Sequence, residues 1–243
     1  MRFPVTIHDP DVVLTDLGLA LLGAWFAWRL VRTARGGPLE GAPALLMAGL
    51  ASAAFWGAIF HAFFPENTAT LPGFIAWIPV TLSIVVAAAT LLDLGLRALL
   101  PGIRPRVRLA LVASYAVTFA LAVLLVDESF TTIVRFYVPA LLLFLAAALV
   151  KALRGQSGWR AIALGLALSA GAAVLQQLRV ALHPAYFDHN AVYHLVQAAA
   201  LVLLYVGFER VAVTSPRGPS ASAASSAPAP ARSAVSTPPP AAS

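Results

Sequence analysis

The sequence predicts an all-α integral membrane protein, a bundle of seven transmembrane helices. Of its 243 residues, 60% are hydrophobic and only 11% are charged, a balance that the surface of a water-soluble globular protein would not tolerate. A helix that crosses the hydrocarbon core of a bilayer needs about 20 mainly apolar residues. Seven stretches satisfy this requirement, at about 11–33, 43–64, 73–100, 107–126, 131–153, 158–182 and 190–213.

The two ends of the chain are expected to behave differently. The first apolar stretch is too long for the core of a cleaved signal peptide and runs directly into Arg29, Arg32 and Arg35, so we expect it to be retained as a helix. The last residues are mostly Ser, Pro and Ala and offer almost nothing to bury. We therefore expect a transmembrane domain over residues 1–214 and a disordered tail over residues 215–243.

The distribution of basic residues predicts the orientation in the membrane, because cytoplasmic loops carry an excess of Lys and Arg. Thirteen of the 16 basic residues fall on one side: Arg29, Arg32, Arg35, Arg97, Arg104, Arg106, Arg108, Lys151, Arg154, Arg160, Arg210, Arg217 and Arg232. The N-terminus is then outside and the C-terminus cytoplasmic, in a multi-pass protein of a cell membrane. The abundance of Ala and Arg favours a bacterial inner membrane. Because this charge sits at membrane edges and no nucleic-acid motif is present, we expect no nucleic-acid partner.

Histidines predict a site at the opposite, outer side of the membrane. All five fall there: His8, His61, His183, His189 and His194. His61 lies about one turn inside the apolar boundary, where an ionisable group is costly unless it has a partner. Imidazole suits Zn²⁺, and a catalytic zinc has three protein ligands and a water. We therefore expect His61, His189 and His194 to bind zinc.

Outer carboxylates supply candidates for proton transfer beside such an ion. Glu66, Asp188 and Asp16 are the candidate catalytic residues, as general acid or base. Asp188 could instead orient an imidazole ligand. Since the chain has no cysteine, thiolate nucleophiles and cysteine-ligated metals are excluded.

The layout of these residues resembles the CREST superfamily, which includes alkaline ceramidases and the progestin/adiponectin receptor-like proteins. The pattern of that superfamily is Ser-x-x-x-His in the second helix and His-x-x-x-His in the seventh. His61 and His194 match one histidine of each motif, whereas Gly57 stands at the serine position and Asn190 at the remaining histidine. The resemblance, to a divergent bacterial member, implies a zinc-dependent membrane hydrolase that cleaves an amide or ester of a lipid-like substrate.

Two other functions stay open at this point. The bundle could be a transporter or a receptor-like protein whose outer polar pocket binds a ligand without chemistry. It could also transfer electrons, with His61 and His194 as axial ligands of a b-type haem. Pro79 and Pro139, inside the third and fifth stretches, predict kinks rather than the broken helices of transporters. The pattern does not predict the substrate or the oligomeric state.

Overall fold

The computed structural model describes residues 6–33, 39, 41–65, 67–183 and 187–214. Within them, seven helices are long and apolar enough to cross a membrane, which confirms the predicted helical, multi-pass fold class. The helices are α1 Pro10–Thr33, α2 Ala42–Phe63, α3 Leu71–Leu99, α4 Pro105–Leu121, α5 Phe130–Leu153, α6 Trp159–Gln177 and α7 His189–Thr214. A π-helical segment, Ala122–Val126, continues α4, and a 3₁₀ turn, Asn67–Ala69, precedes α3. The predicted tail, residues 215–243, lies outside the described residues.

Local signals explain where several of these helices begin and end. Thr70 and Ser129 precede α3 and α5, and each side chain accepts a hydrogen bond from a backbone N–H of the first turn. The end of α6 differs from the prediction: it stops at Gln177, five residues early. Arg179 has a left-handed φ of 51°, a conformation that ends helices. Arg179 and His183 therefore lie beyond the end of α6.

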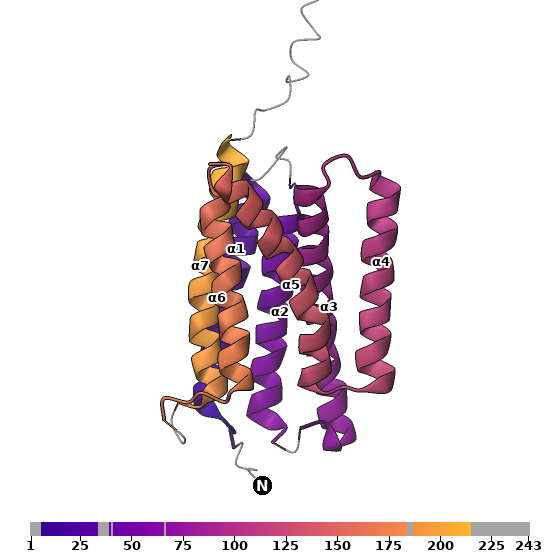
Figure 1. Cartoon of the computed structure of the whole chain (residues 1–243). Coiled ribbons are helices and arrows are strands. Elements are labelled where there is room, and N and C mark those ends of the chain that lie inside the picture. The colour runs from indigo at the N-terminus through magenta and orange to yellow at the C-terminus, as the bar shows by residue number, and fades with distance from the viewer. Residues whose placement is uncertain (1–5, 34–38, 40, 66, 184–186, 215–243) are drawn as a thin grey trace, which may run out of the picture.

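Six of the helices close into a ring, and α4 stands outside it. Each ring helix packs extensively against the next: α1 against α2, α2 against α3, α3 against α5, α5 against α6, α6 against α7, and α7 against α1. The main partner of α4 is α3, and Figure 1 shows α4 at the edge of the bundle beyond α3. Short connections between antiparallel helices favour such neighbour-to-neighbour packing. As a result, α1 is the common neighbour of α2 and α7.

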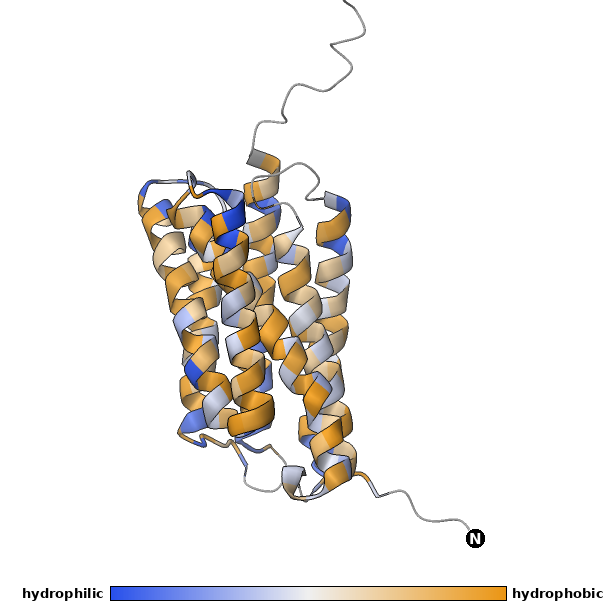
Figure 2. Ribbon diagram, turned by 90° about the vertical axis from the view of Figure 1, so that its right-hand side faces the viewer, coloured by the Kyte–Doolittle hydropathy of each residue, from blue (hydrophilic) through white to orange (hydrophobic). Residues whose placement is uncertain are grey.

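The helices have two chemically different ends, and Figure 2 shows the hydrophilic residues mostly towards them. We call one the basic end, because most of the described basic residues lie there: Arg29, Arg32, Arg97, Arg104, Arg106, Arg108, Lys151, Arg154, Arg160 and Arg210. We call the other the histidine end; there α1, α3, α5 and α7 begin and α2, α4 and α6 end.

The ring is tightly packed in its basic half. Phe144 of α5 and Phe208 of α7 are fully buried and stack on each other. Glycines let α6 and α7 approach closely, because a Cβ at Gly207 would lie only 2.5 Å from Ile162 Cγ1. This packing fills the interior of the ring near the basic end.

Candidate functional site

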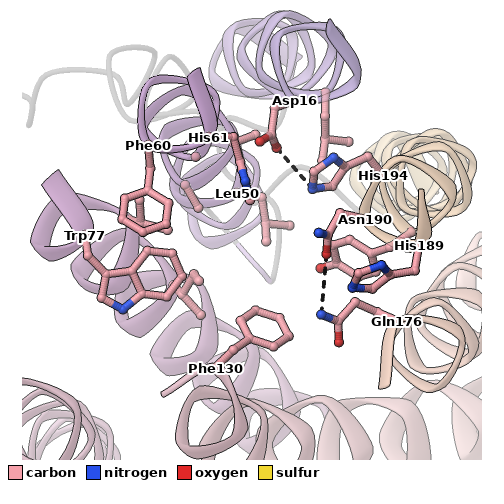
Figure 3. A pocket seen from close by; sticks show the side chains of 17 residues that line it. Asp16, Leu50, Phe60, His61, Trp77, Phe130, Gln176, His189, Asn190 and His194 are labelled. Carbon is pink, nitrogen blue, oxygen red and sulfur yellow. Dashed lines mark hydrogen bonds and ion pairs between the residues drawn. The ribbon is translucent and has the colours of Figure 1, made fainter. Parts of the chain in front are cut away.

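A cavity of about 280 Å³ lies inside the ring near the histidine end, and all six ring helices line it. Figure 3 shows that its walls differ in chemistry. The polar side chains are Asp16, His61, Gln176, His189, Asn190 and His194, and the aromatic ones facing them include Phe60, Trp77 and Phe130. A largely apolar pocket with a few convergent polar groups is typical of small-molecule sites.

Asp16 and His194 form the most buried part of the polar wall. The Nε2 atom of His194 lies 3.1 Å from Oδ1 of Asp16, and its Nδ1 atom lies 3.1 Å from Oγ1 of Thr15. Asp16 is 3% exposed and His194 is 8% exposed. Because α1 and α7 are neighbours in the ring, the two side chains meet although their positions are far apart in the sequence.

The contacts of Thr15 favour one position for the proton of His194. The Thr15 hydroxyl is within 2.9 Å and 3.0 Å of the backbone carbonyls of Asp11 and Val12, to which it donates. A hydroxyl has one proton, so while it donates to a carbonyl it can only accept from His194, which favours protonation of Nδ1. The contact between Nε2 and Asp16 then requires one further proton, shared between the two atoms. Asp16 and His194 thus hold a proton in the wall of the cavity.

The second carboxylate oxygen of Asp16 is enclosed by α2. Oδ2 is buried and has no hydrogen-bond partner among the described residues, and a Cβ at Gly57 would lie 3.0 Å from it. That distance is shorter than an ordinary van der Waals contact, so a side chain at position 57 would press on Asp16. The glycine at position 57 therefore has a steric explanation: the carboxylate from α1 lies against it.

The three predicted zinc ligands all line the cavity, but each faces a carboxylate of its own. Nδ1 of His61 lies 4.0 Å from Oδ2 of Asp9, and Nδ1 of His189 lies 3.5 Å from Oδ2 of Asp188. Among the described residues, no three His, Asp or Glu side chains are grouped closely enough to hold a metal ion. The residues as they lie do not form the three-histidine donor set predicted from the sequence, and we derive no catalytic step through a metal.

The three predicted catalytic carboxylates have different positions. Asp16 reaches the cavity and pairs with a predicted histidine. Asp188 caps α7 instead: its Oδ1 accepts hydrogen bonds of 2.8 and 2.9 Å from two backbone N–H groups of the first turn, and it does not line the cavity. Its own N–H donates to Oδ2 of Asp11, which ties the start of α7 to α1. Glu66 lies outside the described residues.

Several residues of the site were not predicted. Thr15 precedes Asp16 within the first apolar stretch, and such a polar pair inside a span is a signal that could have identified it. The aromatic wall carries no comparable signal, because Trp and Phe near the ends of spans are common at membrane interfaces. Trp77 is fixed there by a 3.0 Å hydrogen bond from its Nε1 to the backbone carbonyl of Glu128.

The model of a family of unknown function (DUF6962) matches residues 12–213, which include all seven helices almost completely. No curated protein and no solved structure matches the chain.

Proposed function

The chain belongs to this family, DUF6962, and we propose that it is an integral membrane protein that binds an amphiphilic small molecule between its helices. The observation that carries this proposal is the two-sided cavity, with a buried Asp16–His194 pair in one wall and aromatic rings in the other. Polar groups fix the orientation of a ligand, and the apolar lining provides most of its contact area.

The depth of the polar wall indicates what part of a ligand it receives. Asp16 lies six residues after Pro10, the first residue of α1, which corresponds to about 9 Å along the helix. The polar group of a bound ligand would therefore lie inside the bundle, about 9 Å from its histidine end. The rest of the ligand would contact Phe60, Trp77 and Phe130. The cavity volume of about 280 Å³ lies near the lower limit of small-molecule sites, roughly 300 Å³. It suits the head and the adjoining chain of a lipid-like molecule.

Binding can be tested on the purified protein. Mass spectrometry of an organic extract of the wild-type protein is expected to find a co-purified amphiphile, which His194→Leu loses. His183→Leu is the matched control, because His183 lies at the same end but does not line the cavity. An amphiphile retained equally by both variants, or absent from the wild type, would contradict the proposal.

We further propose that the histidine end faces outward and the basic end faces the cytoplasm, as positively charged residues favour the cytoplasmic side. Since the chain has no cysteine, single cysteines report sidedness without background. A cysteine replacing exposed Ala69, at the histidine end, should react with a membrane-impermeant maleimide in spheroplasts. One replacing exposed Gly102, at the basic end, should react only after lysis. The reverse result would invert the orientation.

Hydrolysis of an amide or ester of the bound molecule is the second candidate function. The observation that favours it is the proton held between Asp16 and His194. As water adds to the carbonyl, the pair would give this proton to the departing amine or alcohol, and the proton of the water would restore the pair.

Measurements of substrate hydrolysis and of the zinc and haem content of the purified protein separate these candidate functions. Hydrolysis predicts release of fatty acid from lipid amides or esters by the wild type and its loss in Asp16→Asn, with the amphiphile still bound. If the wild type binds the amphiphile but releases no fatty acid, the protein binds its ligand without catalysis. Stoichiometric zinc in the purified protein, lost in His61→Ala, would support a metal enzyme, whereas a Soret band would indicate haem.

A further inference from the structure

Two further polar side chains are buried on α6 and α7, on the basic side of His194. Ser169 of α6 and Gln197 of α7 are each 4% exposed, and neither lines the cavity of the proposed function. The hydroxyl of Ser169 has no hydrogen-bond partner among the described residues. The carboxamide of Gln197 likewise makes no hydrogen bond within the described part of the chain. Buried polar groups are normally paired, so these two need an explanation.

The hydroxyl of Ser169 does not bond to its own helix. A serine or threonine inside a helix can donate to the backbone carbonyl four residues before it. Thr81, Ser83 and Thr90 of α3 all do so, over distances of 2.6 to 3.0 Å. Ser169 does not make this bond, so its hydroxyl is available to a group outside α6.

The register between α6 and α7 places Ser169 opposite Gln197. The two helices are antiparallel neighbours, and Nε2 of Gln176 donates to Oδ1 of Asn190 over 3.5 Å near the histidine end. Seven residues are close to two helical turns, so Ser169 projects from the same face of α6 as Gln176. Gln197 projects from the same face of α7 as Asn190 for the same reason. Towards the basic end the helices stay close together, because a Cβ at Gly165 would lie 2.8 Å from a side chain of α7.

The space between the two polar groups suits one water molecule. A Ser and a Gln side chain together contain one bond fewer than a Gln and an Asn side chain, a difference of about 1.5 Å. Added to the 3.5 Å of the Gln176–Asn190 contact, this difference leaves about 5 Å between the polar groups of Ser169 and Gln197. That distance is too long for one hydrogen bond, but two hydrogen bonds of about 2.8 Å through a water span it.

The cavity brings water to this depth of the bundle. Ser169 lies eight residues before Gln177, the last residue of α6, which corresponds to about 12 Å along the helix from the histidine end. The cavity lining extends further, to Ile84, which lies 13 residues after Leu71, the first residue of α3, or about 19 Å along that helix. The cavity therefore passes the level of the Ser169–Gln197 pair.

We propose that one ordered water molecule bridges the Ser169 hydroxyl and the Gln197 carboxamide. Buried waters typically make roughly two to four hydrogen bonds to polar groups that would otherwise be unpaired. A hydroxyl and a carboxamide offer both donors and acceptors to such a water. The water ties α6 to α7 two turns below the direct Gln176–Asn190 contact, and it does so whether or not the cavity holds a ligand.

A crystal structure of the full-length protein, at a resolution that shows ordered waters, tests this proposal. Density for one water is expected within hydrogen-bond distance of both Ser169 Oγ and the Gln197 carboxamide. Ser169→Asn lengthens the side chain by one bond, so its amide should reach Gln197 directly and expel the water. Ser157→Asn is the matched control, because it makes the same change at an exposed position in the turn before α6.

The same water can be followed in solution, because the chain has only four glutamines: Gln156, Gln176, Gln177 and Gln197. With ¹⁵N-labelled glutamine, the side-chain amide of Gln197 should show a nuclear Overhauser effect to a long-lived water in wild type and in Ser157→Asn. Ser169→Asn should lose this signal. A direct Ser169–Gln197 hydrogen bond, a Ser169 hydroxyl that donates within α6, or a water signal unchanged in Ser169→Asn would overturn the proposal.

Discussion

Asp16 of α1 packs directly against Gly57 of α2. A Cβ at position 57 would lie 3.0 Å from the carboxylate oxygen Oδ2 of Asp16. This contact links α2 to the Asp16–His194 pair, which in turn joins α1 to α7. The polar wall of the cavity therefore depends on the absence of a side chain at one position.

Substitutions of Gly57 test this dependence. Gly57→Ala should destabilise the protein by about 1–3 kcal/mol, because its Cβ overpacks against Asp16. Gly57→Ser adds the same Cβ together with a hydroxyl that can donate to the partnerless Oδ2, so it should be about 1 kcal/mol more stable than Gly57→Ala. Reversible unfolding in mixed micelles measures both. Gly171→Ala, where a Cβ meets nothing within 4 Å, is the control, and serine no better than alanine would refute the explanation.

Most of the fold could be predicted, because spanning length and hydrophobicity are properties of contiguous sequence. Six of the seven predicted spans agree with the helices within about two residues. The end of α6 could not be predicted, since it depends on the left-handed backbone of Arg179, a residue other than glycine. The exclusion of α4 from the ring was also not predicted. Its sequence is as apolar as that of its neighbours, and only packing places it outside.

The sequence predicted at which end of the bundle the site residues lie, but not which carboxylate pairs with which imidazole. His61, His189, His194 and Asp16 were all expected at one end, and all four line the cavity. Which carboxylate meets which imidazole depends on helix rotation and on neighbours in the ring, and neither is encoded in the spacing along one helix. Since α1 packs between α2 and α7, Asp16 meets His194.

Thr15 should control the tautomer of His194. Thr15→Ser keeps an acceptor for Nδ1 and should preserve protonation of that nitrogen, whereas Thr15→Val removes the acceptor. ¹⁵N spectra of the ring nitrogens at neutral pH are expected to show a protonated Nδ1 in wild type and Thr15→Ser, and a changed pattern in Thr15→Val. The same spectrum for all three proteins would mean that Thr15 does not set the proton position.

Asp127, in the loop before α5, should make stability depend on pH at low pH. Hydrogen bonds from the side chains of Thr132 and Ser129 and from the Ser129 backbone hold the pKa of Asp127 below its usual value of 3.8. A lowered pKa in the folded state stabilises the protein above the unfolded-state value, and this contribution is lost as the pH falls through the folded-state value. The destabilisation caused by Asp127→Ala should therefore be full near neutral pH and shrink below pH ~4. Unfolding measured across this range tests the prediction, and a constant difference would contradict it.

A double-mutant cycle should show strong coupling between Asp16 and His194. Removing one partner leaves the other polar group buried and unpaired, so Asp16→Leu or His194→Leu should each cost about 3–5 kcal/mol. The double variant leaves neither group unpaired, and its cost should be less than the sum of the single costs by 1 kcal/mol or more. Free energies of unfolding in mixed micelles provide the four values. Asp9→Leu combined with His194→Leu is the control, because Asp9 faces His61 instead and should give additive costs. Additive costs for Asp16 and His194 as well would mean that the two side chains do not share a proton in the folded protein.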